Sequence, residues 1–252
     1  MMKTFVKRLQ ETFFPARDYI KFSGSILPLP ERRKCGRKFD DDTFFVQSAE
    51  HEAQRLIEHF DCTSATRVLD IGCGEGRLPI GCLRVMGKLQ YLGLDVQPRA
   101  IEWCKRYIER QHPSFRFHLL NVANERYNRG GLPLNQDFKF DVPDHSVDII
   151  YLFSVFSHMN EADMRIYLAD FRRILTDGGN VFFTTFVEEN VPKFSINPEN
   201  YIFEKCSGPL HIVRYEKYHL FSILEESGFV LENFTHRTEV DQQSALYLKK
   251  RQ

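Results

Sequence analysis

The sequence predicts an α/β fold: a seven-stranded, mainly parallel sheet with helices on both faces and an N-terminal helical cap. From Arg67 onward, short apolar runs alternate with amphipathic stretches, which is typical of repeated βαβ units. Hydrophobic residues make up 42% of the 252 positions and aromatic residues 13%, enough to cover both faces of a sheet. We therefore expect a cap or lid segment over residues 1–62 and one α/β domain over 63–252.

The cap is expected to be helical because its apolar residues recur at helical spacing. Phe5, Leu9 and Phe13 show this spacing before Pro15 interrupts it. A second helix is predicted from about 42 to 60, where Phe45, Ala49, Ala53, Leu56, Ile57 and Phe60 share one face.

The α/β region divides into strands and helices in regular alternation. The predicted strands are Arg67–Ile71, Gln90–Asp95, Phe115–Asn121, Val147–Leu152, Asn180–Phe186, Val230–His236 and Ser244–Lys249. The predicted helices are Leu78–Met86, Pro98–Gln111, Glu161–Leu175 and Tyr215–Ser227. A long insertion, residues 124–140, precedes the fourth of these strands.

The net charge and the cysteine spacing indicate which partners, among nucleic acid, metal ions and membranes, are not expected. Lys plus Arg and Asp plus Glu both number 34, so no net field favours nucleic acid. The basic run from Arg32 to Lys38 is followed by three aspartates; it indicates a solvated loop or, as the lesser alternative, a contact with an anionic substrate. No Cys or His spacing indicates a metal site. Without a secretory signal or an apolar span, we expect a cytoplasmic protein with no membrane partner; its oligomeric state is left open.

The strongest local feature is an apolar strand that ends in a glycine-rich turn and leads into a predicted helix, Val68-Leu69-Asp70-Ile71-Gly72-Cys73-Gly74-Glu75-Gly76. Glycines here let a ligand approach the backbone N–H groups, and only glycine adopts positive φ at little cost. The segment therefore predicts a ligand loop, although three glycines can also form a plain tight connection.

A carboxylate ends the next predicted strand. Asp95 closes the run Tyr91-Leu92-Gly93-Leu94-Asp95 and lies 21 positions after Gly74, near the spacing of about 20 residues expected for an acid that binds ribose hydroxyls. Its alternative role is to cap the helix that begins near Pro98.

The spacing of the glycines distinguishes a dinucleotide cofactor from other cofactors. In the dinucleotide pattern G-x-G-x-x-G the glycines serve a diphosphate, but here the third glycine falls one place early and Arg77 occupies its position. Asp70-x-Gly72-x-Gly74-x-Gly76, followed by Asp95, resembles the first two motifs of class I S-adenosylmethionine-dependent methyltransferases of the small-molecule type. The resemblance implies a Rossmann-like sheet and S-adenosylmethionine, which has no phosphate, as the cofactor.

The resemblance extends over about Arg67 to Phe186. Asp144–Ile150 resembles the start of that family's fourth strand, Ser154–Met159 the segment after it, and Phe171–Gly179 the helix and turn before the fifth strand. The cofactor-binding residues that it implies are Asp70, Gly72, Cys73, Gly74, Gly76, Asp95, Val96, Asn121, Val122, Phe153 and Ser154. Of these, the glycine turn and Asp70 would surround the methionine end, and Asn121 and Val122 would contact adenine.

Methyl transfer from a sulfonium needs alignment more than chemical groups, because the donor is already activated. An acceptor hydroxyl or ammonium must still lose a proton, for which a histidine is suited. His158 is the first candidate because it follows the fourth strand, whose carboxyl end faces the expected cleft; it could instead cap or pack against the helix near Glu161. Other residues expected near this rim, each more commonly structural, are Glu188, Glu189, His211, Tyr215 and His219.

The acceptor pocket is less defined. Phe182, Phe183 and Phe186 fit a buried strand better than a pocket, and Phe44–Gln47 is the preferred lid segment. We expect a small-molecule acceptor methylated on oxygen or nitrogen. The Asn-Pro-Pro-aromatic turn of adenine and amide methyltransferases is missing after the fourth strand. The alternatives are a protein or nucleic-acid substrate, a nicotinamide-dependent oxidoreductase, and a non-catalytic S-adenosylmethionine-binding protein.

Overall fold

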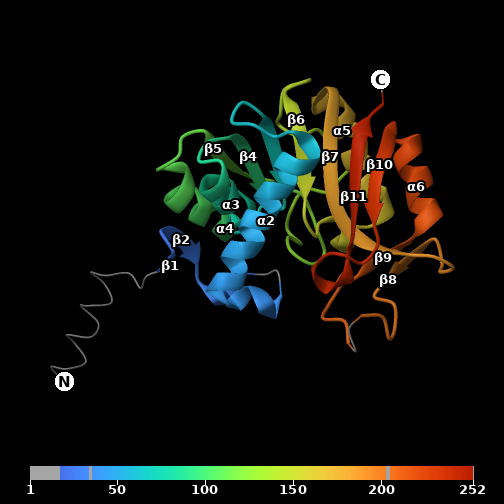
Figure 1. Ribbon diagram of the computed structural model, residues 1–252. Helices are drawn as coiled ribbons and strands as arrows, with labels where there is room; N and C mark the ends of the chain where they lie inside the picture. The colour runs from blue at the N-terminus through green and yellow to red at the C-terminus, as the bar shows by residue number, and fades with distance from the viewer. Residues whose placement is uncertain (1–17, 34–35, 203–204, 252) are drawn as a thin grey trace.

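The computed structural model describes residues 18–33, 36–202 and 205–251. Its centre is a twisted sheet in which seven strands lie in the order β10-β11-β7-β6-β3-β4-β5 (Figure 1). Strand β11 runs antiparallel to both of its neighbours, β10 and β7, and all other neighbouring pairs in this series are parallel. The strands are β3 (Arg67–Ile71), β4 (Gln90–Asp95), β5 (Phe115–Leu119), β6 (Val147–Leu152), β7 (Leu175–Glu188), β10 (Phe229–Thr235) and β11 (Ser244–Lys250).

The strand order reverses at β3, and this reversal positions the site. From β3 the chain moves outward to β4 and β5, then crosses back to form β6 on the other side of β3. The connections that leave the carboxyl ends of β3 and β6 therefore go in opposite directions. In open α/β sheets a ligand crevice forms at such a point.

Two apolar cores lie on opposite faces of the sheet, because successive strand residues point to opposite sides. Leu69 of β3 and Phe183 of β7 belong to the core shared with α5 and α6. Val68 and Phe182 belong to the core shared with α2, α3 and α4. The helices are α2 (Asp42–Phe60), α3 (Arg77–Val85), α4 (Pro98–Cys104), α5 (Glu161–Ile174) and α6 (Lys217–Glu226). Helices thus cover both faces, which confirms the predicted fold class.

Helix α2 packs closely on α3. A Cβ added to Gly81 of α3 would lie 1.9 Å from the backbone oxygen of Ala49, so the two helices meet at a position that only glycine allows. The Asp41 side chain caps α2 by accepting from the Phe44 N–H. Leu27, Phe39 and Phe45 share a core with sheet residues such as Val68. The described part of the predicted cap is therefore continuous with the α/β core.

The structure adds elements that the sequence patterns did not indicate. Part of the predicted cap is a hairpin, β1 (Tyr19–Phe22) and β2 (Ser25–Pro28), joined by the turn at Ser23 and Gly24. Two short strands, β8 (Phe194–Ile196) and β9 (Val213–Glu216), extend the far end of β7. The prediction of a helix from Tyr215 was therefore early by two residues, because α6 begins at Lys217 after a strand.

Two predicted elements also differ in length. The helix predicted to reach Gln111 is α-helical only to Cys104 and continues as the π-helical segment η3 (Lys105–Glu109). Strand β7 pairs with β6 at Leu175, then resumes at Asn180, so the predicted turn at 177–179 is a bulge opposite Asp148. The Phe5–Phe13 pattern and Pro15 lie outside the described residues, as does Lys34. In the described ranges no helix has the length and apolarity needed to cross a membrane.

Candidate active site

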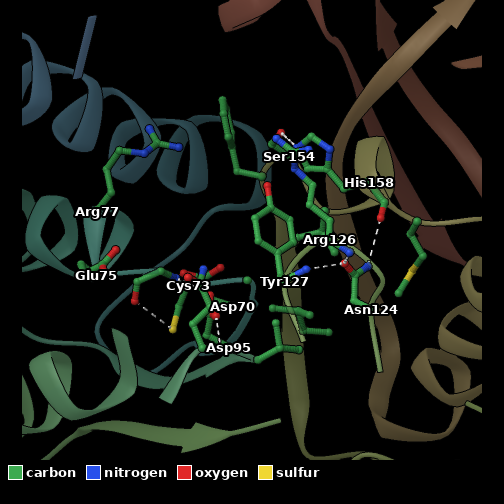
Figure 2. A pocket seen from close by; sticks show the side chains of 18 of the residues that line it. Asp70, Cys73, Glu75, Arg77, Asp95, Asn124, Arg126, Tyr127, Ser154 and His158 are labelled. Atoms are coloured by element: carbon green, nitrogen blue, oxygen red, sulfur yellow. Dashed lines mark hydrogen bonds between the residues drawn. The ribbon is translucent and has the colours of Figure 1, made fainter. Parts of the chain in front are cut away.

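A cavity of about 660 Å³ lies at the carboxyl ends of the parallel strands, on both sides of the reversal at β3. Ten of the twelve residues singled out from the sequence contribute to its lining. They are Asp70, Gly72, Cys73, Gly74, Asp95, Val96, Val122, Phe153, Ser154 and His158. Figure 2 shows Asp70, Cys73, Glu75 and Asp95 on one side of this cavity, Asn124, Arg126 and His158 on the other, and Tyr127 between them.

The glycine turn after β3 is built for close approach. Gly72, Gly74 and Gly76 have φ values of +79°, +51° and +80°, which favour glycine at all three positions. A Cβ on Gly72 would lie 2.5 Å from a methyl group of Val155, so the turn and the segment after β6 lie in contact across the cavity floor.

The backbone amides of this turn are directed inward, contrary to the expectation that they point at a ligand. The N–H groups of Gly72 and Cys73 donate to the carbonyl oxygen of Leu94, at 2.7 and 3.0 Å. The Gly74 N–H donates to Asp95 Oδ2 at 2.8 Å. These donors are satisfied within the protein. The glycines are therefore needed for the positive φ values of the turn and for the absence of side chains next to the cavity.

Asp95 braces the turn and also faces the cavity. Its Oδ2 accepts from the Gly74 N–H, and its Oδ1 accepts from the Gln97 N–H at 2.8 Å, at the start of α4. The alternative role, as the cap of α4, is not the one observed, because the N-cap is Gln97 and no side chain caps this helix. Ribose binding stays a prediction. A carboxylate oxygen has two lone pairs, so each can still accept from a sugar hydroxyl.

Asp70 is a buried acid at the same end of the cavity. Its Oδ2 accepts a hydrogen bond from the hydroxyl of Tyr91, on the adjacent strand. Burial raises the pKa of Asp70 to about 7, although the Tyr91 hydrogen bond and the charge of Arg77 act in the opposite direction. Near neutral pH the carboxyl group is thus poised to ionise when a cation approaches.

His158 lies on the opposite side, after β6. Its Nδ1 is 2.9 Å from the Leu210 carbonyl oxygen; because a carbonyl only accepts, Nδ1 carries the proton. Nε2 is then an acceptor, 3.4 Å from Ser154 Oγ. Burial lowers the pKa of His158 to about 4, helped by the charge of Arg126, so the ring is neutral at physiological pH.

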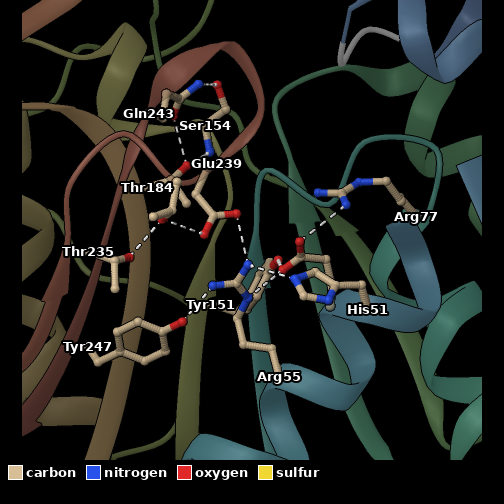
Figure 3. A network of polar contacts seen from close by, with 12 residues as sticks. His51, Arg55, Arg77, Tyr151, Ser154, Thr184, Thr235, Glu239, Gln243 and Tyr247 are labelled. Carbon is tan, nitrogen blue, oxygen red and sulfur yellow. Dashed lines mark hydrogen bonds and ion pairs between the residues drawn. The ribbon is translucent and has the colours of Figure 1, made fainter. Parts of the chain in front are cut away.

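Ser154 is held in an unusual conformation by a closed set of hydrogen bonds. Its φ is +58°, in the left-handed region. Its N–H donates to Thr184 Oγ1, the Thr184 hydroxyl donates to Gln243 Oε1, and Gln243 Nε2 donates to Ser154 Oγ, each at 2.8 Å (Figure 3). Because Ser154 Oγ accepts from Gln243, its own proton is available to His158 Nε2 or to Ser157 Oγ.

A buried charge network joins α2 to the cavity wall (Figure 3). Glu52 accepts from Arg55 Nε at 3.0 Å and from the Tyr151 hydroxyl at 2.5 Å, and Arg77 Nη1 lies 3.7 Å from its other oxygen. Arg55 also pairs with Glu239 at 2.8 Å. Arg77, at the position of a third dinucleotide glycine, is thus directed to Glu52, with its guanidinium 4.3 Å from the Phe153 ring.

Two of the predicted cofactor-binding residues do not line the cavity. Gly76 is the N-cap of α3, and a Cβ there would lie 2.6 Å from Ile108, so this glycine allows α3 and η3 to pack closely. Asn121 is exposed, and its carbonyl accepts from the Leu132 N–H at 3.1 Å. The chain turns after β5, and this directs Val122 inward in its place.

The aromatic and rim residues divide between core and cavity. Phe182 and Phe183 are core residues, as expected, while Phe186 lines the cavity together with Phe45 of the predicted lid segment. Of the other rim residues, only His211 lines it. Glu188 and Glu189 instead pair with basic side chains, Tyr215 is buried, and His219 contacts Glu161.

Several cavity residues were not identified from the sequence. Arg126 and Tyr127 belong to the insertion after β5, and the position of that insertion at a strand's carboxyl end was a usable signal. Gln243 gave no such signal, since its partner Ser154 lies 89 positions away, and neither did Glu52, which contacts the cavity residue Tyr151 from 99 positions away. In the described part of the chain, no group of three His, Cys, Asp or Glu side chains is arranged to hold a metal ion.

Comparison with known proteins agrees with this geometry. A family model described as a methyltransferase domain matches residues 69–181. An uncharacterized methyltransferase of Schizosaccharomyces pombe is 22% identical over 115 residues, 46% of this chain. The match spans only 38% of that relative's length.

Solved structures show the same fold at low identity. A methyltransferase from Aquifex aeolicus has a TM-score of 0.54 and 17% identity, covering 91% of this chain and 99% of that one. The 1,6-didemethyltoxoflavin-N1-methyltransferase of Burkholderia thailandensis has a TM-score of 0.54 and 14% identity, covering 84% and 82%. The [4+2]-cyclase SpnF has a TM-score of 0.56 and 15% identity, covering 81% and 82%. Residues 69–181 thus match a methyltransferase domain, and the fold of the chain is the one that these solved methyltransferases share.

Proposed function

We propose that this protein transfers the methyl group of S-adenosylmethionine to a hydroxyl or amino group of a small molecule. The observation that carries the proposal is one cavity of about 660 Å³ whose lining runs from the glycine turn and Asp95 to His158. Small-molecule pockets have volumes of roughly 300–1,000 Å³. Phe45, Tyr127 and His211 line it from three separate segments, which favours a small acceptor over a macromolecule.

The cofactor end fits the chemistry of a sulfonium compound. When bound, S-adenosylmethionine supplies a methyl group already activated for displacement. Glu75, Asp95 and, once ionised, Asp70 line this end, and their negative charge complements the sulfonium and ammonium groups. We assign the ribose hydroxyls to Asp95, the methionine end to Asp70 and the glycine turn, and adenine to Val122.

His158 is proposed as the general base. Its Nε2 accepts the proton that an acceptor hydroxyl loses as the new bond to the methyl carbon forms and the carbon–sulfur bond breaks; an acceptor ammonium gives its proton to Nε2 first, which frees the nitrogen lone pair for attack. The Leu210 carbonyl fixes the tautomer that leaves Nε2 unprotonated. A neutral ring at physiological pH means that this acceptor is present without prior loss of a proton.

Two alternatives predict different products. A protein or nucleic-acid methyltransferase would leave the methyl label on a macromolecule. A non-catalytic binding protein would hold the cofactor and label nothing; the occurrence of this fold in a protein described as a [4+2]-cyclase shows that the fold alone does not specify methyl transfer.

The test has two stages. First, S-adenosylmethionine or S-adenosylhomocysteine should raise the melting temperature, and NAD should not. Second, methyl-labelled cofactor is incubated with the protein and an extract of the source organism, and labelled products are divided by size and identified by mass spectrometry. Label in a small molecule supports the proposal, and label in macromolecules contradicts it. Bound cofactor without labelled product favours the non-catalytic alternative. Replacing the exposed His145 with Gln serves as the control for His158→Gln.

A further inference from the structure

The two ends of the cavity carry opposite charge. Asp70, Glu75 and Asp95 line the end assigned to the cofactor, whereas Arg126 lies across the cavity beside His158 (Figure 2). A sulfonium donor accounts for the acidic end. The basic end faces the space left for the methyl acceptor, so its positive charge indicates which charge the acceptor carries.

Arg126 is anchored but incompletely satisfied. Its Nη1 donates to the Ser207 carbonyl at 2.7 Å and lies 3.5 Å from that of Pro209. Its Nε is buried and has no hydrogen-bond partner among the described residues. A buried donor without an acceptor is unfavourable, so this group indicates that a hydrogen-bond acceptor is missing from the cavity.

The charge of Arg126 is also uncompensated locally. Across the described ranges, no carboxylate oxygen lies within 4.0 Å of its guanidinium nitrogens, whereas Arg33, Arg55 and Arg77 each have such a partner. Nη1 fixes the guanidinium in place, which leaves the edge formed by Nε and Nη2. Because Nε is buried, an anion in the cavity meets Nη2 first, and two parallel hydrogen bonds to a carboxylate or a phosphate form when the side chain turns its Nε toward the anion.

Further cations border the same cavity. Arg37 and Lys38 are exposed residues of the segment η2 (Arg37–Asp40) and line the cavity. Asp241 lies near Lys38 and offsets part of its charge, while Arg37 has no carboxylate partner within the ranges described. Arg37 and Arg126, from distant segments, thus both border the cavity with little negative charge close to them. Their combined positive charge increases the attraction of the cavity for an anion.

We propose that the methyl acceptor is an anionic small molecule whose carboxylate or phosphate group is bound by Arg126. This inference rests on the proposed function. Anchoring the anion beside His158 places the rest of the acceptor between Arg126 and the sulfonium. Arg126 is then a specificity-determining residue, and a neutral analogue of the acceptor leaves its guanidinium unpaired.

The competing explanation is that Arg126 only holds the 205–211 segment through Ser207 and Pro209. In that case its loss would affect folding and catalysis regardless of the acceptor's charge. It would not change the affinity for an acid more than the affinity for the corresponding neutral compound.

The first experiment identifies the charge of the product. Small-molecule label from the methyl-transfer incubation is applied to an anion-exchange column at neutral pH, before and after phosphatase treatment. Retained label supports the inference, and loss of retention after phosphatase shows a phosphate rather than a carboxylate. Label that flows through overturns the inference while methyl transfer stands. Absence of labelled product overturns the proposed function, and the inference with it.

The second experiment ties the anion to Arg126. With the purified acceptor, Arg126→Gln should raise KM for the acceptor at least about 30-fold. The dissociation constant of S-adenosylhomocysteine should be unchanged, and Arg126→Lys should recover part of the loss. Arg129→Gln is the matched control, because Arg129 is an exposed arginine of the same insertion outside the cavity. An unchanged acceptor KM in Arg126→Gln, or equal losses for the acceptor and its uncharged amide or ester, would refute the assignment.

Discussion

Replacement of Asp95 tests the central feature of the site, because the observed role of this carboxylate, bracing the turn, and its proposed role, binding ribose, can be measured separately. In Asp95→Ala, the N–H groups of Gly74 and Gln97 lose their acceptor. Each such loss costs about 1–3 kcal/mol, and both contacts are only partly buried, so we expect a destabilisation of about 2–3 kcal/mol. Two hydrogen bonds from ribose hydroxyls to a charged acceptor add about 3 kcal/mol to cofactor binding, so affinity should fall about 100-fold.

The assays are urea unfolding and calorimetric titration with S-adenosylhomocysteine. Asp95→Asn keeps one acceptor oxygen and should lose less stability than Asp95→Ala while still binding the cofactor weakly. Asp137→Ala, which alters an exposed aspartate in the insertion, should change neither quantity. Unchanged cofactor affinity in Asp95→Ala would refute the ribose assignment, and an unchanged free energy of unfolding would refute its role in bracing the turn.

Three further perturbations follow from the same structure. His158→Gln should lower the methylation rate about 10²- to 10⁴-fold with unchanged cofactor affinity, and a rate within a few-fold of wild type would remove His158 as the base. S-adenosylmethionine affinity, followed by calorimetry between about pH 5.5 and 8, should rise with pH and level off above about 7. The reason is that the buried Asp70 carboxyl, with its pKa raised to about 7, must release a proton to face a cation. Asp70→Asn should flatten this profile, and a flat wild-type profile would contradict the assignment. Gly81→Ala gains about 1 kcal/mol of helix propensity but places a Cβ 1.9 Å from the Ala49 oxygen, so we expect a net loss of about 2 kcal/mol in urea unfolding. Gly130→Ala, where a Cβ has open space, should stay within about 0.5 kcal/mol; equal effects of the two substitutions would disprove the close helix contact.

Most of the central sheet could be predicted because its strands are marked by local patterns. Buried parallel strands such as Arg67–Ile71 and Val147–Leu152 appear in the sequence as short apolar runs, and the structure has both with the predicted bounds. The hairpin β1–β2 was missed although the Ser23–Gly24 pair is a turn signal, since each strand is only four residues long. Strands β8 and β9 carry no such signal and exist because β7 extends far enough to pair with β9.

The same division applies to the site. The glycine turn and Asp95 were predictable because their requirements are local: positive φ, lack of a side chain, and a carboxylate at the end of the next strand. The predicted direction of the amides was wrong, since they donate to the Leu94 carbonyl and to Asp95 Oδ2, both at the end of the neighbouring strand β4.

By itself, the sequence determined most strands and helices of the central sheet and the position of the glycine turn, because those properties depend on residues close together in the chain. Only the tertiary structure decided which distant side chains complete the cavity. Gln243 joins Ser154, Glu52 joins Tyr151, and Arg126 joins His158 only when the sheet and its covering helices have assembled. The physical reason is that hydrogen bonds and charge interactions act over a few ångströms in space, while the order of residues along the chain does not state which of them will be brought to that distance.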